Sequence, residues 1–394
     1  MSYALGVIAF SFALLLSVML HEAGHFATAK AFGMKASRFF VGFGPTLWSF
    51  TRGETEYGIK AIPAGGFVKI EGMTALEEID PADADRAFYK QPAGKRTIVL
   101  CAGSFVHFLI AIFLVFGILA ATGQDPIRTD GFSIAAVSNC ITSAPSGLCK
   151  PGDPRAPALG VLREGDRLVS INGQPISKTG ENFVNILRAS PGKAVAITFT
   201  RAGVRRTVSL TPLPLVVKGK TQGRIGVAEE QDAAQVSVAG AIPRTFGVLG
   251  DFITSTGSAI GGLPHEVAQI VEGKPRGQNG AASVVDVARV SGQISASGAS
   301  VGDIVASLLL LIAELNLFVG LFNMLPLLPL DGGHVGILAF EQARSRIYKA
   351  IGRRDPGRVD IMKVLPLTYA VVAAFVGLSL ILLYAGIVNP IRLQ

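Results

Sequence analysis

Uncharged apolar residues are concentrated in long blocks of the sequence, which cover residues 3–20, 97–121, 304–325 and 365–388. At about 1.5 Å of rise per helical residue, each block is long enough to cross most or all of a ~30 Å hydrocarbon core. The pattern therefore predicts four transmembrane helices. No Lys or Arg precedes the first block, so we expect it to be a span rather than a cleaved signal peptide.

Between the second and third blocks the pattern changes to that of a water-soluble domain. Residues 165–176 are typical of a strand, an Asn-Gly turn and a second strand, and residues 182–188 carry apolar side chains at helical spacing. Two alternating strands are expected at residues 194–200 and 207–210. After the first block, residues 39–70 contain short β-prone runs separated by Gly and Pro, which predicts hairpins.

Basic residues near the ends of the spans predict the orientation of the chain. They cluster between the first and second spans and between the third and fourth: Lys30, Lys35, Arg38, Lys90, Lys95, Arg96, and then Arg344, Arg346, Lys349, Arg353, Arg354, Arg358 and Lys363. Both loops are expected to be cytoplasmic, so residues 123–303 and both termini should lie outside the cytoplasm. These residues also explain the net charge of +8, and we expect a lipid bilayer and no nucleic acid as partner.

The composition agrees with a membrane protein, since 49% of the 394 residues are hydrophobic and only 16% are charged. Of the three cysteines, Cys101 lies inside the second predicted span, where it is expected to be a packing residue. Cys140 and Cys149 bracket a short loop on the predicted outer side. An oxidising compartment would allow a disulfide there, and two free thiols are the alternative.

The end of the first apolar block carries an H-E-x-x-H motif, formed by His21, Glu22 and His25. On a helix, positions i and i+4 share a face, so both imidazoles can bind one metal ion while the glutamate reaches water at that ion. This arrangement predicts a hydrolytic zinc site. The alternative is a set of incidental polar residues at a helix end, which is costly beside hydrocarbon unless the residues have a use.

A second polar motif follows the third block. Asp331 comes after a helix end broken by proline, and its carboxylate can complete a three-ligand zinc site that leaves a fourth position for water. An ordinary Asp-Gly-Gly turn is the alternative. Asn316 and Asn323 share a helix face, so either can bond the substrate or another helix. His107 in the second span is interpreted as a packing residue and not as a metal ligand.

The order of these motifs along the chain resembles the site-2 protease family of intramembrane zinc metalloproteases. The H-E-x-x-H motif is followed by a Gly-Phe-Gly loop, a segment that resembles a PDZ domain, and an Asn-Pro-Asp-Gly stretch. The chain is most similar to the bacterial branch called regulator of sigma-E protease. This resemblance implies that His21, His25 and Asp331 bind Zn²⁺, that Glu22 is the general base, and that Asn323 contacts the substrate or the oxyanion.

The resemblance also implies a substrate class and a location. Family members cut the membrane span of a single-pass protein after an upstream site-1 protease has shortened its outer domain, and typical substrates are anti-sigma factors or remnant signal peptides. The expected location is the bacterial inner membrane, with the active site towards the cytoplasm. The hairpins of residues 41–70 are expected to engage the substrate as a strand. One feature differs, because only one PDZ-like segment is found where the best-known members carry two.

The predicted fold is a polytopic α-helical membrane protein with four transmembrane helices, a membrane-associated β-hairpin region and an inserted extracytoplasmic PDZ-like α+β domain. The expected domains are the first transmembrane helix with the H-E-x-x-H motif at 1–32, the Gly-rich hairpin region at 33–96, the second transmembrane helix at 97–122, the PDZ-like domain at 123–215, a linker or amphipathic region at 216–303, the third transmembrane helix at 304–330, a basic cytoplasmic loop at 331–364 and the fourth transmembrane helix at 365–389.

Two other functions are possible on these residues. A non-catalytic membrane adaptor would combine a PDZ peptide-binding domain with a structural metal site. A structural zinc site closes all four positions with protein ligands, and His334 is the candidate for the fourth. A transporter would predict inverted repeats with paired broken helices, and the sequence has neither.

Overall fold

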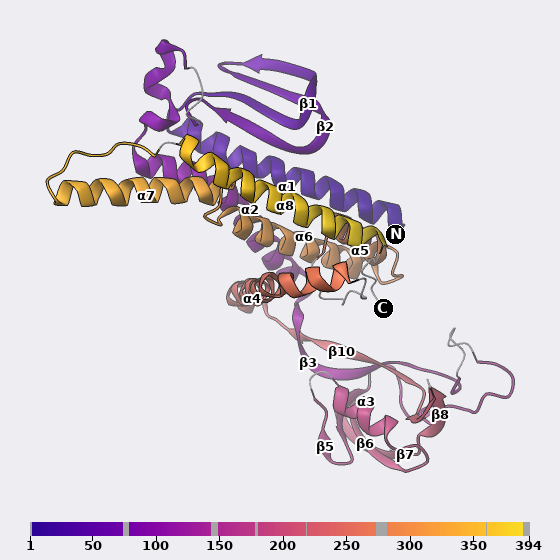
Figure 1. Cartoon of the computed structure of the whole chain (residues 1–394). Helices are drawn as coiled ribbons and strands as arrows, with labels where there is room; N and C mark the ends of the chain where they lie inside the picture. The colour runs from indigo at the N-terminus through magenta and orange to yellow at the C-terminus, as the bar shows by residue number, and fades with distance from the viewer. Residues whose placement is uncertain are drawn as a thin grey trace. The chain divides into compact units, whose positions relative to one another are not determined.

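The computed structural model describes residues 2–73, 79–142, 149–177, 180–217, 219–272, 282–359 and 361–388. Contacts within the chain divide it into two compact units. One consists of Met1–Ile118 and Ile242–Gln394 and the other of Leu119–Ala241 (Figure 1). Each unit is described by itself.

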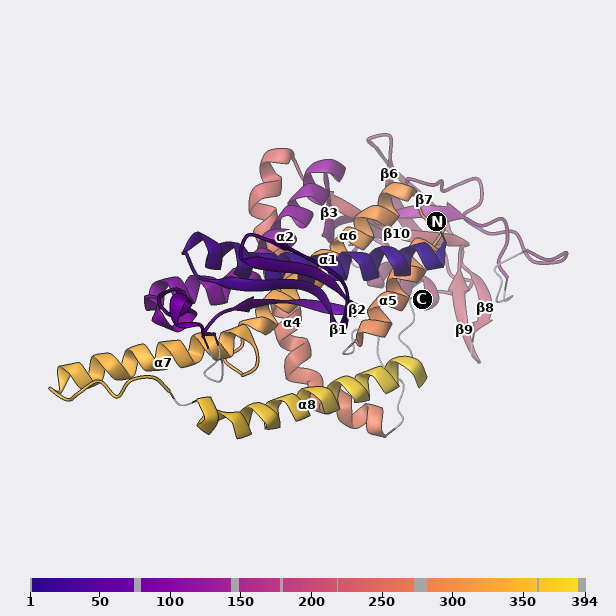
Figure 2. The same ribbon diagram turned by 90° about the horizontal axis from the view of Figure 1, so that it is seen from above.

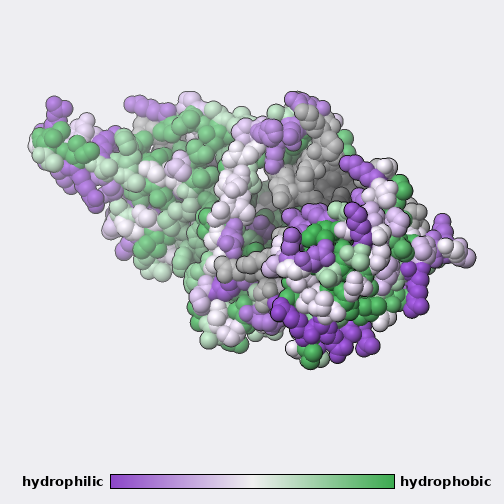
Figure 3. Space-filling view, turned by 90° about the horizontal axis from the view of Figure 1, so that it is seen from below, coloured by the Kyte–Doolittle hydropathy of each residue, from purple (hydrophilic) through white to green (hydrophobic). Residues whose placement is uncertain are grey.

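Within the described chain, four helices are long and apolar enough to span a membrane. They are α1 (Tyr3–Ala31), α2 (Ala93–Thr122), α6 (Val301–Asn323) and α8 (Ile361–Val388). The four predicted spans are thus confirmed as helices. In the unit that contains most of these helices, Met1–Ile118 and Ile242–Gln394, apolar residues make up much of the visible surface (Figure 3). This is expected if the unit faces lipid tails.

Small residues let these helices approach one another closely, which is typical of packing in membranes. A Cβ atom added at Gly24 of α1 would lie 2.8 Å from the carbonyl oxygen of Ala102 on α2. At Gly320 of α6 it would lie 2.8 Å from the ring of Phe108 on α2. Glycines of α1 and α6 therefore lie at their contacts with α2, and Figures 1 and 2 show these helices running together.

Further helices of the described chain are η1 (Pro81–Arg86), η2 (Phe88–Lys90), α4 (Val238–Val271), α5 (Val284–Ser295) and α7 (Asp331–Ala350). Helix α5 begins with a reciprocal capping box between Ser283 and Asp286, which satisfies backbone donors that a helix start leaves open. Helix α7 begins at the predicted metal ligand Asp331.

The predicted hairpin region forms one antiparallel sheet from two long, bent strands, β1 (Ala36–Arg52) and β2 (Thr55–Ile70). Because of the bends, Phe39 pairs both with Tyr57 and with Val68. The register thus gives four short segments in the order 46–52, 55–60, 36–41 and 66–70. Segment 66–70 lies at one edge of the sheet.

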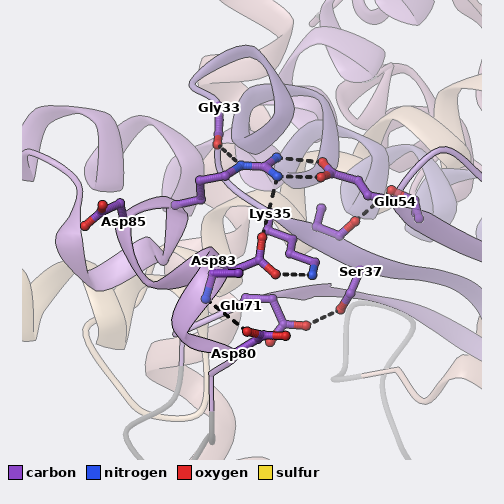
Figure 4. A network of polar contacts seen from close by, with 12 residues as sticks. Gly33, Lys35, Ser37, Glu54, Glu71, Asp80, Asp83 and Asp85 are labelled. Atoms are coloured by element: carbon purple, nitrogen blue, oxygen red, sulfur yellow. Dashed lines mark hydrogen bonds and ion pairs between the residues drawn. The ribbon is translucent and has the colours of Figure 1, made fainter.

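Ion pairs fasten this sheet to the end of α1 and to η1 (Figure 4). The carboxylate of Glu54, in the turn between the strands, accepts hydrogen bonds of 2.6 and 2.8 Å from Arg86 and also pairs with Lys30. Hydrogen bonds from these two cations lower the pKa of Glu54 to about 2. A second ion pair joins Lys35, which precedes β1, to Asp83 of η1, so both the turn and the start of β1 are held.

The unit Leu119–Ala241 contains the second sheet, whose strands are antiparallel in the order β10-β3-β4-β6-β7. Its elements are β3 (Gln124–Val137), β4 (Arg167–Ile171), β5 (Gln174–Pro175), α3 (Glu181–Arg188), β6 (Val195–Arg201), β7 (Val204–Leu210), β8 (Leu213–Val217), β9 (Lys220–Arg224) and β10 (Val227–Gln235). Strand β10 pairs with β3, so the sheet continues past residue 215 into the segment 216–303, for which a linker or amphipathic region was predicted.

The local predictions for this unit agree with the structure. Asn172 and Gly173 form the turn between β4 and β5 with φ angles of 49° and 78°, as the Asn-Gly hairpin requires. Phe183 of α3 is fully buried in the core of the unit. Cys140 and Cys149 form a disulfide, with their Cα atoms 5.9 Å apart, so the first of the two alternatives for these cysteines is correct.

Candidate metal centre

Helix α1 carries both histidines of the H-E-x-x-H motif on one face. His21 and His25 are only 7% and 5% exposed, and their Nε2 atoms lie 3.1 Å apart. The helix continues to Ala31, so the motif lies within a candidate span rather than at its end. Both imidazoles therefore present the same ring nitrogen to one point.

Asp331 reaches this point from the start of α7. Its Oδ2 atom is 3.3 Å from Nε2 of His21 and 3.4 Å from Nε2 of His25. The next residues, Gly332 and Gly333, lie against the turn that follows α6, where added Cβ atoms would meet backbone atoms at 2.3 and 2.6 Å. The Asp-Gly-Gly sequence is therefore required by close packing, which brings the carboxylate to the histidines.

The three ligand atoms fit a zinc ion. Two ligands at about 2.0–2.1 Å from a tetrahedral zinc are about 3.3–3.4 Å apart, and the observed separations are 3.1, 3.3 and 3.4 Å. Asp331 Oδ2 is buried without a hydrogen-bond partner in the described chain. Two basic nitrogens and a carboxylate oxygen this close repel one another unless a cation or proton lies among them.

The number of protein ligands distinguishes a catalytic zinc site from a structural one, and the donor set here contains three residues. Within the described chain, only His21, His25 and Asp331 form a group of ligand atoms close enough to share one ion. His334, the candidate for a fourth ligand, is not part of that group. A site with three protein ligands keeps an open position, which is typical of catalytic rather than structural zinc.

Backbone groups hold the motif in place. His25 Nδ1 lies 2.7 Å from the carbonyl oxygen of Val99 on α2, so Nδ1 donates and Nε2 keeps its lone pair for a metal. Gly103 of α2 lies against both rings, where an added Cβ would be 2.4 Å from His25 Nε2 and 2.5 Å from His21 Cε1. The sequence reasoning missed both residues. Only Gly103, a glycine in an apolar helix, gave any signal.

Glu22 points to the first sheet rather than into the ligand group. Its Oε2 accepts a hydrogen bond of 3.1 Å from the backbone N–H of Val68, in the edge segment of β2. The segment passes close by, since a Cβ at Gly66 would be 3.6 Å from Glu22 Cγ. The carboxylate thus lies next to the metal ligands in sequence without joining them, as a general base requires.

The two asparagines of α6 have different surroundings. Asn316 is 1% exposed, and its amide bonds His107 Nδ1 at 2.8 Å, Ser17 Oγ at 3.1 Å and the carbonyl oxygen of Ile312 at 2.8 Å. It therefore joins helices. Asn323, the last residue of α6, is half-buried, and its side chain makes no hydrogen bond to the described residues. His107 is buried beside His21 and is absent from the ligand group.

Known proteins match this chain over its whole length. The model of peptidase family M50 matches residues 9–354. The zinc metalloprotease Rip1 of Mycobacterium tuberculosis is 35% identical over 407 residues, which cover 100% of both chains. Rip1 of Mycolicibacterium smegmatis is also 35% identical over the full length of both chains. The zinc metalloprotease RasP of Geobacillus kaustophilus is 25% identical and covers 88% of this chain and 90% of its own.

Proposed function

The chain belongs to peptidase family M50, the site-2 protease family, and from that membership we propose that it hydrolyses peptide bonds within or near the transmembrane segment of single-pass membrane proteins. It is a zinc metalloendopeptidase and a bacterial membrane protein. The observation that carries the proposal is the burial of the donor set on α1, a helix apolar enough to span a bilayer. A site at that depth reaches peptide that is itself in the membrane.

In this proposal His21, His25 and Asp331 hold Zn²⁺, which is supported by their converging ligand atoms. The bound ion supplies a Lewis acid that polarises the scissile carbonyl and activates water. Glu22 takes a proton from the attacking water as the new C–O bond forms. It then gives that proton to the leaving amine as the C–N bond breaks. The amide of Asn323 contacts the substrate or donates to the developing oxyanion.

The edge of the first sheet is proposed to hold the substrate. A helical segment has its backbone hydrogen bonds closed internally, so it must unwind before its carbonyl can be attacked. Segment 66–70 pairs with another strand on one side only in the described chain. Strand addition at its free side needs only backbone groups, and the bond from Val68 to Glu22 supports a position beside the base.

The unit Leu119–Ala241 is proposed to be a single PDZ-like domain outside the cytoplasm. Its antiparallel sheet and single packed helix α3 support this assignment, together with a cavity of about 470 Å³ lined by α3, β8, β9 and the start of β10. Val184 and Leu187 line the cavity from α3, and the segment 223–227 lines it from the strands. Such a groove suits an extended peptide. The basic loops place both termini on the same outer side in this proposal, with the active site towards the cytoplasm.

The proposed partners are single-pass proteins such as anti-sigma factors or remnant signal peptides, after a site-1 protease has shortened them. The test uses the purified chain in liposomes with a model single-pass substrate, supplied with its full outer domain or already shortened. Mass spectrometry should map the cut within or near the transmembrane segment, with a preference for the shortened form. Cuts confined to the water-exposed domain would reject the proposal.

The alternative of a non-catalytic adaptor with a structural metal site is not supported. It needs a fourth protein ligand, and none joins the ligand group in the described chain. The relatives that match this chain over its full length are named zinc metalloproteases.

A further inference from the structure

The two histidines of the metal centre are held in different ways. His25 donates through Nδ1 to the carbonyl oxygen of Val99, 2.7 Å away. Nδ1 of His21 is buried and has no hydrogen-bond partner in the described chain. Ligating histidines usually bond an outer group through the second ring nitrogen, which fixes the ring. Another contact must therefore set the orientation of the His21 ring.

The side chain of His107 is in the right position to do so. Its ring centroid lies 5.0 Å from that of His21, with the ring planes inclined by 40°. His107 is 2% exposed, and its Nδ1 lies 2.8 Å from Oδ1 of Asn316. The amide oxygen can only accept, so Nδ1 donates. This bond fixes the plane of the His107 ring.

Asn316 is itself fixed by two further bonds. Its amide nitrogen donates to Ser17 Oγ at 3.1 Å and to the carbonyl oxygen of Ile312 at 2.8 Å. Ser17 precedes His21 by one helical turn on the same face of α1. Gly320, one turn after Asn316, lets α6 come close, because a Cβ there would lie 3.1 Å from Cβ of His107. The cluster thus joins α1, α2 and α6 beside the metal centre.

We propose that His107, held by Asn316, is a positioning residue that orients the ring of His21 for zinc binding through ring contact instead of a hydrogen bond. The proposal rests on the assignment of His21 as a zinc ligand. Polar groups buried at membrane depth are costly and are kept where they have a use. An apolar side chain would fill the same space without that cost, but it would not have a ring whose plane is fixed by a hydrogen bond.

The test measures zinc binding rather than cleavage. Apo-protein in detergent is titrated with zinc against a chelator, and Co²⁺ is used as a spectroscopic probe of the ligand geometry. His107→Leu should weaken zinc binding by ~10–100-fold, the usual effect of losing an outer contact of a ligand, and should shift the Co²⁺ absorption bands. Asn316→Leu should shift the same bands, because the His107 ring is then free to turn.

A control separates positioning from helix packing. Val115 is fully buried on α2, about 12 Å along the helix from His107. Val115→Ala should lower the unfolding temperature but leave the zinc affinity and the Co²⁺ spectrum unchanged. The double variant His107→Phe/Asn316→Leu keeps an aromatic ring and leaves no unpaired donor, but no hydrogen bond fixes the plane of its ring. It should therefore bind zinc more weakly than the unmodified protein and keep the shifted Co²⁺ bands.

The outcomes also separate this proposal from the proposed function. If folded His107→Leu binds zinc with the affinity and Co²⁺ spectrum of the unmodified protein, the positioning role is wrong. The same holds if Val115→Ala shifts the spectrum as much, or if the double variant has the zinc affinity and spectrum of the unmodified protein. If His21→Ala also binds zinc normally, the ligand assignment itself fails. Loss of zinc in His21→Ala together with normal zinc binding in His107→Leu supports the ligand assignment and rejects only the role of His107.

Discussion

A single methyl group added at Gly103 should remove zinc from the protein while its helices stay folded. The Cβ atom of alanine would lie 2.4 Å from His25 Nε2 and 2.5 and 2.6 Å from Cε1 and Nδ1 of His21. Non-bonded heavy atoms prefer about 3.5–4.0 Å, so the rings must retreat by about 1 Å. Metal–ligand distances tolerate only about ±0.2 Å. The displacement is thus several times larger than the site accepts.

The cost to the fold should be much smaller than the cost to the site. Overpacking a well-filled interior costs about 1–3 kcal/mol, and replacing glycine by alanine inside a helix returns roughly 0.5–1 kcal/mol. Gly103→Ala should therefore unfold at a slightly lower temperature in detergent. Its zinc content, measured by mass spectrometry after dialysis, should fall well below one ion per chain.

Two glycines of the same unit serve as matched controls. A Cβ at Gly117 of α2 meets no atom within 4 Å, so Gly117→Ala should keep both zinc and stability. A Cβ at Gly6 of α1 would lie 2.4 Å from the carbonyl oxygen of Ser291, about 22 Å along the helix from His21. Gly6→Ala should lower stability but keep zinc. Full zinc in Gly103→Ala, or equal zinc loss in Gly6→Ala, would refute the reasoning.

Three further predictions concern other parts of the chain. Asp331→Asn should weaken zinc binding by more than the ~10–100-fold typical of outer contacts, and an unchanged zinc affinity would point to another third ligand. The pKa of Glu54 is lowered from 4.5 to about 2 by Arg86 and Lys30. Its stabilising effect is therefore present above pH 4.5 and lost as the pH falls towards 2. Glu54→Gln should make the unfolding temperature depend less on pH over this window. Reduction of the Cys140–Cys149 disulfide should lower the free energy of unfolding of its unit by about 2–3 kcal/mol. Calorimetry with and without reductant measures this difference, and an unchanged free energy would contradict the prediction.

The membrane helices and the metal ligands were predictable because their signals are local. Apolar blocks of span length identify the helices, and the spacing of His21 and His25 puts two imidazoles on one face. Asp331 lies about three hundred residues away in sequence, and its contact with the histidines is made by tertiary packing. Asp331 was a candidate because it is a polar residue that follows a span broken by proline. The resemblance to a protease family then paired it with the two histidines.

The remaining parts of the site were not predictable, because backbone atoms form them. The N–H of Val68 that bonds Glu22 and the carbonyl of Val99 that bonds His25 exist at every residue of any sequence. Their use depends on the bends of β1 and β2 and on the packing of α2. Strand β10 was missed for a different reason. Its sequence, Val227–Gln235, is rich in Ala, Glu and Gln, which have little strand preference, and it is ordered by pairing with β3.

The central claim is that Glu22 acts as the base of a zinc protease whose substrate lies in the membrane. The most direct measurement compares Glu22→Gln with the unmodified chain in liposomes that contain a single-pass substrate, with zinc content and cleavage product measured on the same sample. Glu22→Gln should contain full zinc and give no product, because the ligand set is intact and the proton acceptor is gone. Undiminished cleavage by the zinc-loaded variant would contradict it.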